Sequence, residues 1–145
     1  MYQILAYIKF LFSSTNQHGV HSPFIFNFVT KCLYDKTKHA DYSKLIDYRT
    51  ALLRNNDSIE ITDFGSGSRV FKSNTRTTRD IAKKSGTPLK RAKLLYRLVT
   101  YFKPKHTLEL GTSLGIATHS MAVGSSENKI TSIEGCPKIA LYAKK

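Results

Sequence analysis

Residues 107–122, TLELGTSLGIATHSMA, combine a short apolar run, a turn with two glycines four positions apart, and an amphipathic run. A strand that ends at such a turn and continues as a helix is typical of α/β proteins that bind a ligand there. Gly111 can adopt backbone angles closed to other residues, and its bare main chain lets a ligand approach. Gly115 lets the helix begin close to the strand. We therefore expect a strand over 106–110 and a helix from about 116.

The segment after this turn predicts a second strand and a further helix. KITSIE (129–134) is strand-like, and Pro137 begins another helical pattern. Strand, helix and strand in this order form a βαβ unit with parallel strands and a right-handed crossover. Parallel sheets are normally covered by helices on both faces. We therefore expect the chain to be a piece of a larger fold, or a sheet that partner chains, including a second copy, complete; we favour the first.

The residues upstream divide into two further segments. Residues 1–58 are expected to form an N-terminal helical region with three helices. The first ends near Ser13, and the second begins at Pro23 with Ser22 as its N-cap. The third covers residues 41–55. Residues 59–87 are expected to hold a strand over 59–64, a Gly-rich loop, a basic linker and a short helix over 78–84. Residues 88–145 begin the α/β domain.

Helical spacing also predicts which side chains of two helices are buried. In the third helix we expect Leu45, Ile46, Tyr48, Leu52 and Leu53 to face inward. Thr87 and Pro88 are expected to open the helix that follows Gly86. Its buried stripe is expected to contain Leu89, Ala92, Leu95, Leu98, Val99 and Phe102.

Positive charge is concentrated in the middle of the chain. The net charge is +13, and residues 69–105 hold twelve Lys and Arg against one acid. Such a block can mark a face for nucleic acid or an anionic substrate. It can also be the solvated side of a helix, which we favour slightly. An alternative function is therefore a basic nucleic-acid-binding module without catalytic activity, with contacts through residues 69–105.

The polar residues around the glycine turn favour a nucleoside-bearing cofactor. Thr112 and Ser113 offer hydroxyls and backbone N–H groups at a helix N-terminus, which suit a carboxylate or phosphate. Glu134 lies at the tip of the second strand, 23 positions after Gly111, where an acid can bind ribose hydroxyls. Glu109 can accept N–H bonds from the loop or from a ligand amino group. NAD is disfavoured because the Gly-x-Gly-x-x-Gly pattern is absent.

These stretches carry a resemblance to a known family. LELGTSLGIATHS followed by ITSIE resembles the first and second motifs of class I S-adenosylmethionine-dependent methyltransferases, and is closest to the Glu-x-Gly-x-x-x-Gly variant of small-molecule O-methyltransferases. YFKPKHTLELG is similar to the same group, and HGVHSPFIFNFV and DFGSGSRVFKSNTR resemble a set of bacterial proteins of this class. The resemblance implies a Rossmann-like methyltransferase fold with an N-terminal helical extension. This chain would supply the first two of seven strands.

The resemblance also implies a cofactor, S-adenosylmethionine, and a reaction. It implies that Glu134 holds the ribose and that the methionine part is lined by Glu109, Gly111, Thr112, Ser113 and Gly115. The implied chemistry is in-line transfer of a methyl group from a sulfonium to a nucleophile. A small-molecule hydroxyl is favoured as acceptor. No residue is identified as the catalytic base, and whether this chain alone is active stays open.

A second glycine-rich stretch, ITDFGSGSRV (61–70), lacks the helix that would follow a cofactor turn. We expect a loop that lies over the cofactor or substrate, or a hairpin or linker with solvated charges. Its useful groups are Ser68, Arg69, Lys72 and Arg76.

The remaining residues indicate neither a metal site nor an exported protein. His18 and His21 have no third ligand nearby, so packing in a loop is favoured over a metal. Cys32 and Cys136 are expected to be free thiols in a reducing, cytoplasmic compartment, with Cys136 a small buried residue. No run is long enough to span a membrane. The apolar N-terminus lacks the basic leader and cleavage site of a signal peptide.

Overall fold

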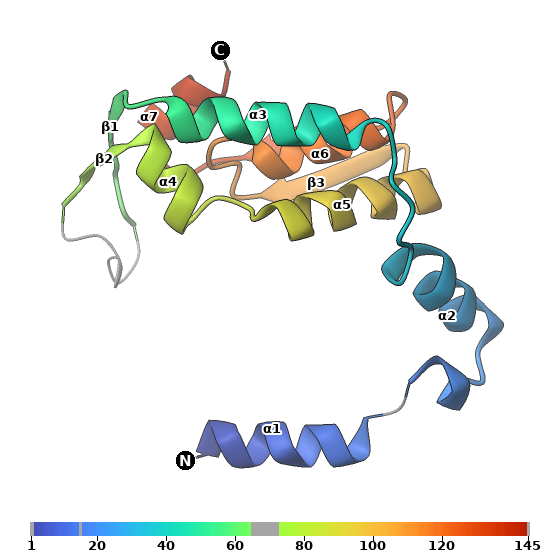
Figure 1. Cartoon of the computed structure of the whole chain (residues 1–145). Coiled ribbons are helices and arrows are strands. Elements are labelled where there is room, and N and C mark those ends of the chain that lie inside the picture. Colours follow the sequence, from blue (N-terminus) through green and yellow to red (C-terminus); the bar gives the residue numbers. More distant parts are fainter. Residues whose placement is uncertain (1, 15, 65–72, 145) are drawn as a thin grey trace. The chain divides into compact units, whose positions relative to one another are not determined.

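The computed structural model describes residues 2–14, 16–64 and 73–144, which belong to two compact units (Figure 1). The first unit spans Met1–Lys36 and the second Thr37–Lys145. In the first unit the elements are α1 (Tyr2–Ser13), a 3-10 turn η1 (Gln17–Gly19), α2 (Pro23–Phe28) and a π-helical turn η2 (Val29–Leu33). Ser22 Oγ accepts a hydrogen bond from the N–H of Ile25 at 3.4 Å, which confirms the expected cap of α2.

The second unit is a mixed α/β structure. Its helices are α3 (Tyr42–Arg54), α4 (Thr78–Lys84), α5 (Leu89–Phe102), α6 (Ile116–Gly124) and α7 (Pro137–Ala143). Its strands are β1 (Ser58–Glu60), β2 (Thr75–Thr77), β3 (His106–Leu110) and β4 (Lys129–Ile133). The expected helix over 78–84 is confirmed, and the hydroxyl of Thr77 caps it by accepting from the N–H of Asp80 at 3.1 Å.

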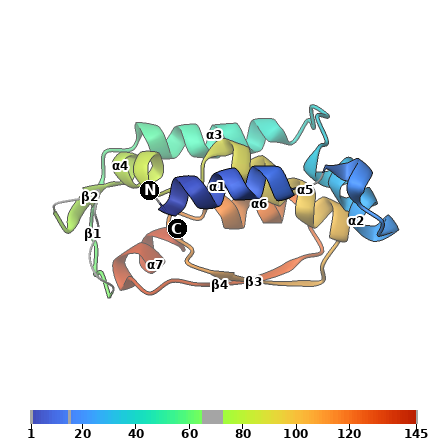
Figure 2. The same cartoon turned by 90° about the horizontal axis from the view of Figure 1, so that it is seen from below.

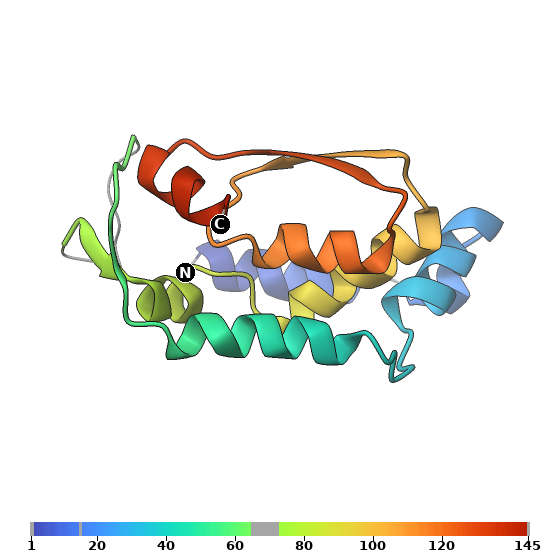
Figure 3. The same ribbon diagram turned by 90° about the horizontal axis from the view of Figure 1, so that it is seen from above.

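The βαβ unit predicted from the glycine turn is present. Strands β3 and β4 pair in parallel, with Leu108 opposite Thr131 and Leu110 opposite Ile133, and α6 connects them. Figures 2 and 3 show α3, α5, α6 and α7 on the same side of the two strands. Because parallel strands end at the same edge, the turn after β3 and the residues after β4 meet there.

The two faces of the β3–β4 sheet differ in their surroundings. Glu109 and Ser132 lie on the half-buried face toward the helices. On the opposite face Leu108, Leu110 and Ile133 are exposed, with 76% of Leu110 accessible. Within the described part of the chain, helices therefore cover this sheet on one face, and Glu109 and Ser132 lie on that face.

The first strand is shorter than expected and belongs to another sheet. A strand was expected over 59–64, but β1 ends at Glu60 and pairs antiparallel with β2, with Ile59 opposite Arg76. Sequence periodicity gave no sign of β2, because three residues are too few to establish an alternation. The antiparallel pair agrees with the hairpin alternative for this region, whereas residues 65–72 lie outside the described residues.

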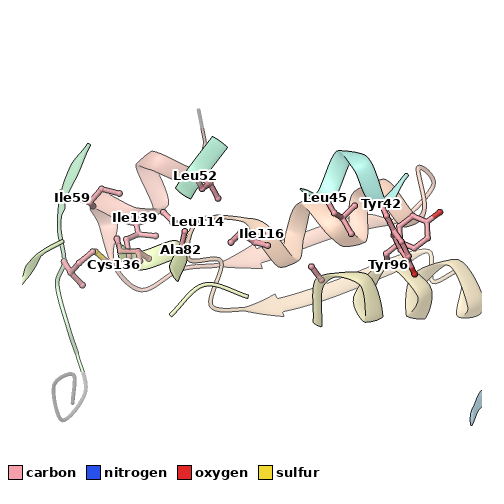
Figure 4. Close-up of a cluster of buried hydrophobic side chains, with 13 residues drawn as sticks. Tyr42, Leu45, Leu52, Ile59, Ala82, Tyr96, Leu114, Ile116, Cys136 and Ile139 are labelled. Atoms are coloured by element: carbon pink, nitrogen blue, oxygen red, sulfur yellow. The ribbon is translucent and has the colours of Figure 1, made fainter. Parts of the chain in front are cut away.

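The core of the second unit extends from α3 and α5 to the beginning of α7 (Figure 4). Leu45 and Leu52 of α3 are buried as expected, but Ile46 is exposed. At one end of the cluster Cys136 and Ile139 pack near β1, and Tyr42 and Tyr96 lie at the other end. The buried residues of the cluster are Tyr42, Leu45, Leu52, Ile59, Ile61, Ile81, Ala82, Ala92, Tyr96, Leu114, Ile116, Cys136 and Ile139.

Helix α5 differs from the sequence-based expectation in its N-cap and in its buried residues. Pro88, not Thr87, occupies its N-cap position, and no side chain caps it. Phe102 was expected inside but is 46% exposed, whereas Tyr96 is buried. Tyr96 can be buried because its hydroxyl donates to Asp41 Oδ2 at 3.2 Å.

Tyr96 belongs to an aromatic cluster with His39 and Tyr42, and its hydroxyl is paired with a carboxylate at the edge of this cluster. The rings of His39, Tyr42 and Tyr96 lie 5.1 to 5.4 Å apart between centroids. Lys44, 2.7 Å from Asp41 Oδ1, lowers the pKa of the Asp41 carboxyl by hydrogen bonding to it. Burial raises the pKa of the Tyr96 hydroxyl, so the tyrosine stays protonated and can donate to this carboxylate.

Helices α5 and α6 approach each other closely at Gly124, which yields a stability prediction. A Cβ at Gly124 would lie 2.5 Å from Val99 Cγ2 and 2.7 Å from the carbonyl oxygen of Tyr96. We expect Gly124→Ala to lower the free energy of unfolding by about 1–3 kcal/mol, because the helices must separate. Urea denaturation followed by circular dichroism measures the change.

Gly135→Ala is the matched control. A Cβ there would make only ordinary contact, 3.7 Å from the ring of Phe64. Its effect should stay within about 0.5 kcal/mol. Equal destabilisation by the two substitutions would contradict the close approach of α5 and α6.

Candidate functional site

The turn between β3 and α6 adopts left-handed backbone angles at three positions. The φ angles are 95° at Gly111, 49° at Ser113 and 73° at Gly115. Gly111 was predicted to adopt angles unfavourable to other residues, and this is confirmed, whereas the positive φ of Gly115 was not predicted. Ser113 was not expected to do so, since a side chain makes this region costly. The turn is also held by the N–H of Gly111, which donates to the carbonyl of Ile133 at 2.8 Å.

Glu134 joins this turn to the end of β4. Its Oε2 accepts from the N–H of Ser113 at 2.8 Å, and its Oε1 accepts from the N–H of Cys136 at 2.9 Å. The first bond compensates for the strained backbone of Ser113. The structure thus brings Ser113 and Glu134 together. Each carboxylate oxygen retains further accepting capacity.

Glu109 is bound by hydroxyl groups beneath the turn. Its Oε2 accepts from Ser132 Oγ at 2.6 Å and also from Thr118 Oγ1. Ser132 Oγ lies 2.6 Å from Thr112 Oγ1 as well. This network joins β3, β4, α6 and the turn, so Glu109 supports the turn from inside the protein. Ser132 and Thr118 were not predicted; the contribution of Ser132 depends on the parallel register, which places it opposite Glu109.

Tyr48 of α3 fixes the beginning of α6. Its hydroxyl donates to the carbonyl of Leu114 at 2.8 Å, and its ring stacks on His119 with centroids 4.4 Å apart. Burial raises the pKa of Tyr48, which favours the protonated donor. A Cβ at Gly115 would lie 3.2 Å from the Tyr48 hydroxyl, so close approach as well as φ favours glycine here.

A small pocket opens beside the turn. Its volume is about 90 Å³, and it is lined by Ser85, Gly86 and Thr87 of the α4–α5 loop together with Ile116 and residues 111–114. The backbone of Gly111 is uncovered among the described residues, because a Cβ built there meets none of their heavy atoms within 4 Å. Drug-sized ligands usually occupy about 300–1,000 Å³. The pocket itself therefore accommodates a small group, while a larger ligand would extend over the uncovered backbone.

The structure gives the other candidate residues structural roles or leaves them untested. Arg76 Nε donates to the carbonyl of Ser73 at 3.2 Å. Cys32 and Cys136 are buried free thiols, as expected. In the described ranges no group of His, Cys, Asp or Glu could hold a metal, and His18 lies 3.2 Å from Gln17 Nε2. Three further candidates lie outside the described residues: Ser68, Arg69 and Lys72.

Comparison with known proteins gives no relative from which a function can be transferred. No family model, curated protein or solved structure matches the chain. Among residues 2–14, 16–64 and 73–144, no helix has the length and apolar character required to cross a membrane.

The two bonds of Glu134 predict a stability effect. Glu134→Ala leaves the N–H groups of Ser113 and Cys136 without their acceptor, and we expect it to lower the free energy of unfolding by about 1–3 kcal/mol. Glu134→Gln should cost less, because its amide oxygen can still accept one bond. Amide exchange at Ser113 and Cys136 should accelerate in Glu134→Ala.

Glu127→Ala provides the control. Glu127 is an exposed acid between α6 and β4, and its removal should change stability by no more than about 0.5 kcal/mol. If Glu134→Ala and Glu127→Ala were equally mild in urea denaturation, Glu134 would not hold the two strand ends together.

Proposed function

We propose that the chain is a class I S-adenosylmethionine-dependent methyltransferase whose Rossmann-like domain begins at residue 88, just before α5. One observation carries the proposal: parallel pairing of β3 and β4 brings the Gly111–Gly115 turn and Glu134 to one edge, where Ser113 N–H donates to Glu134 Oε2 at 2.8 Å. Ligands of open α/β sheets bind at this edge. The sequence resemblance indicates S-adenosylmethionine as the cofactor, and the geometry of the site is compatible with the nucleoside of that cofactor.

The residues at the turn fit a ribose and an amino-acid chain. Ribose hydroxyls can donate to the remaining lone pairs of Glu134, while the uncovered backbone at Gly111 gives the methionine part room to lie against the main chain. Glu109, held by Ser132 and Thr118, keeps the turn in position below. Thr112 and Ser113 complete the lining.

The cofactor would supply an electrophilic methyl group, and the chain would orient the reactants. Holding the acceptor in line with this group is the main contribution expected from such a site. The 90 Å³ pocket beside Thr112 has room for a small part of a ligand. A small-molecule hydroxyl is the favoured acceptor, and the two free thiols suit a cytoplasmic enzyme. No side chain is assigned as the base.

Calorimetric titration with S-adenosylhomocysteine tests the proposal. The unmodified chain and Glu127→Ala should bind equally well. Gly111→Val places a side chain on the ligand side of a residue with φ of 95°, and should weaken binding at least tenfold. Glu134→Gln should also weaken it, because one acceptor oxygen is lost.

Circular dichroism of each variant shows whether it is folded before it is titrated. Equal binding by Gly111→Val, Glu134→Gln and the unmodified chain would contradict the proposed site. So would the absence of binding by the unmodified chain.

The charge distribution supports nucleic-acid binding as a second candidate function. The loop of residues 85–88, whose first three residues line the pocket, has exposed cationic side chains on both sides. These are Lys83 and Lys84 before it and Lys90 and Arg91 after it. Lys84 pairs with Asp80, the single acid of residues 69–105, at 3.5 Å. Cationic side chains around this loop would attract a phosphate backbone.

Fluorescence anisotropy with a labelled single-stranded RNA of twelve nucleotides at increasing salt tests this candidate. With four phosphate contacts, the logarithm of affinity should fall with the logarithm of the salt concentration at a slope of about −3. Lys90→Glu with Arg91→Glu should make the slope shallower by about 1.4. Lys138→Glu with Lys144→Glu changes the net charge equally and should have little effect. Equal losses in both double variants would show that the net charge alone is responsible.

A further inference from the structure

An exposed aromatic ring lies beside the candidate ribose-binding acid. Phe64 follows β1 by four positions, and 76% of its surface is accessible. A Cβ built on Gly135, which directly follows Glu134, would lie 3.7 Å from Phe64 Cδ2 and 3.9 Å from Cε2. One edge of the ring is therefore near the end of β4, while most of the ring contacts water.

The segment that leads to Phe64 is fixed to its neighbours. The N–H of Ile61 donates to the carbonyl of Asn74 at 2.8 Å, and the Ile61 side chain is buried. The N–H of Thr62 donates to Cys136 Sγ at 3.3 Å, and Cys136 N–H donates in turn to Glu134. Hydrogen bonds therefore connect Thr62, two residues before Phe64, to Cys136 and through Cys136 to Glu134.

The exposure of Phe64 is not explained by packing within the described chain. A phenylalanine ring gains stability when it is removed from water, yet Ile59 and Ile61 of the same segment are buried and Phe64 is not. Gly135 has no side chain, and the Cβ of any other residue there would come into ordinary contact with the ring edge. The arrangement leaves an aromatic surface and a carboxylate next to each other at one edge of the sheet.

We propose that Phe64 stacks against the base of the nucleoside whose ribose is held by Glu134. The inference rests on the proposed function and adds a base-binding residue to it. A base is attached directly to the ribose, so a ring that lies next to the ribose-binding acid is within its reach. Aromatic stacking on a base stabilises binding without selecting among bases, since every base has a π-face. Phe64 therefore contributes affinity, and ligands without a base do not use it.

The absence of tryptophan from the sequence makes a direct test available. Phe64→Trp introduces the single indole of the protein at the proposed stacking position. Its fluorescence should be quenched by S-adenosylhomocysteine and by adenosine, with saturation at the concentrations found by calorimetry. Homocysteine, which lacks the base, should leave it unchanged. Phe102→Trp, at the end of α5, places an indole at another exposed phenylalanine and should not be quenched.

Affinities measured by calorimetry separate this inference from the proposed function. Phe64→Ala should weaken binding of S-adenosylhomocysteine about 5- to 100-fold, and Phe64→Tyr should preserve it. If Phe64→Ala binds as tightly as the unmodified chain, stacking by Phe64 is wrong and the methyltransferase proposal stands. If the unmodified chain does not bind S-adenosylhomocysteine, both are overturned. Quenching of Phe102→Trp equal to that of Phe64→Trp would also overturn the inference.

Discussion

The carboxylate of Glu134 connects the turn after β3 to the residues that follow β4, at the edge where the two parallel strands end. One oxygen accepts from Ser113 in the turn after β3, and the other accepts from Cys136 at the start of α7. The left-handed backbone of Ser113 is held by this bond, and the uncovered backbone of Gly111 lies two residues before it. The proposed cofactor site and the inference about the neighbouring ring both depend on this connection.

The sequence predicted the local elements well, because their signals are local. Glycine spacing and apolar periodicity identified β3, α6, β4 and α4, and a parallel pair follows from their order. The stretch that became β2 was missed because three residues show no period. Tyr96 was missed in the core because its burial depends on the distant acceptor Asp41. Thr87 was expected to cap α5, but the N–H groups of Arg91 and Ala92 donate instead to the carbonyl of Pro88.

Only part of the site was predicted, because some of its residues come from segments that are far apart in the sequence. Gly111, Gly115 and Glu134 follow a pattern that one βαβ unit places together. Tyr48, which holds the carbonyl of Leu114, comes from a helix whose packing on α6 no local pattern indicates. Phe64 lies beside Gly135 for the same kind of reason, since the hydrogen bond that brings its segment there joins residues 62 and 136. Periodicity can predict a helix face, but not which distant side chain completes a site.

The proposed site exists only if β3 and β4 run in parallel in the register that brings the glycine turn to Glu134. Through-hydrogen-bond scalar couplings measured by NMR on the isotope-labelled chain test it most directly. The Gly111 amide should couple to the carbonyl carbon of Ile133, since these atoms form a 2.8 Å bond. Coupling of Gly111 to another carbonyl, or cross-strand contacts that place Leu110 opposite Lys129, would contradict the account.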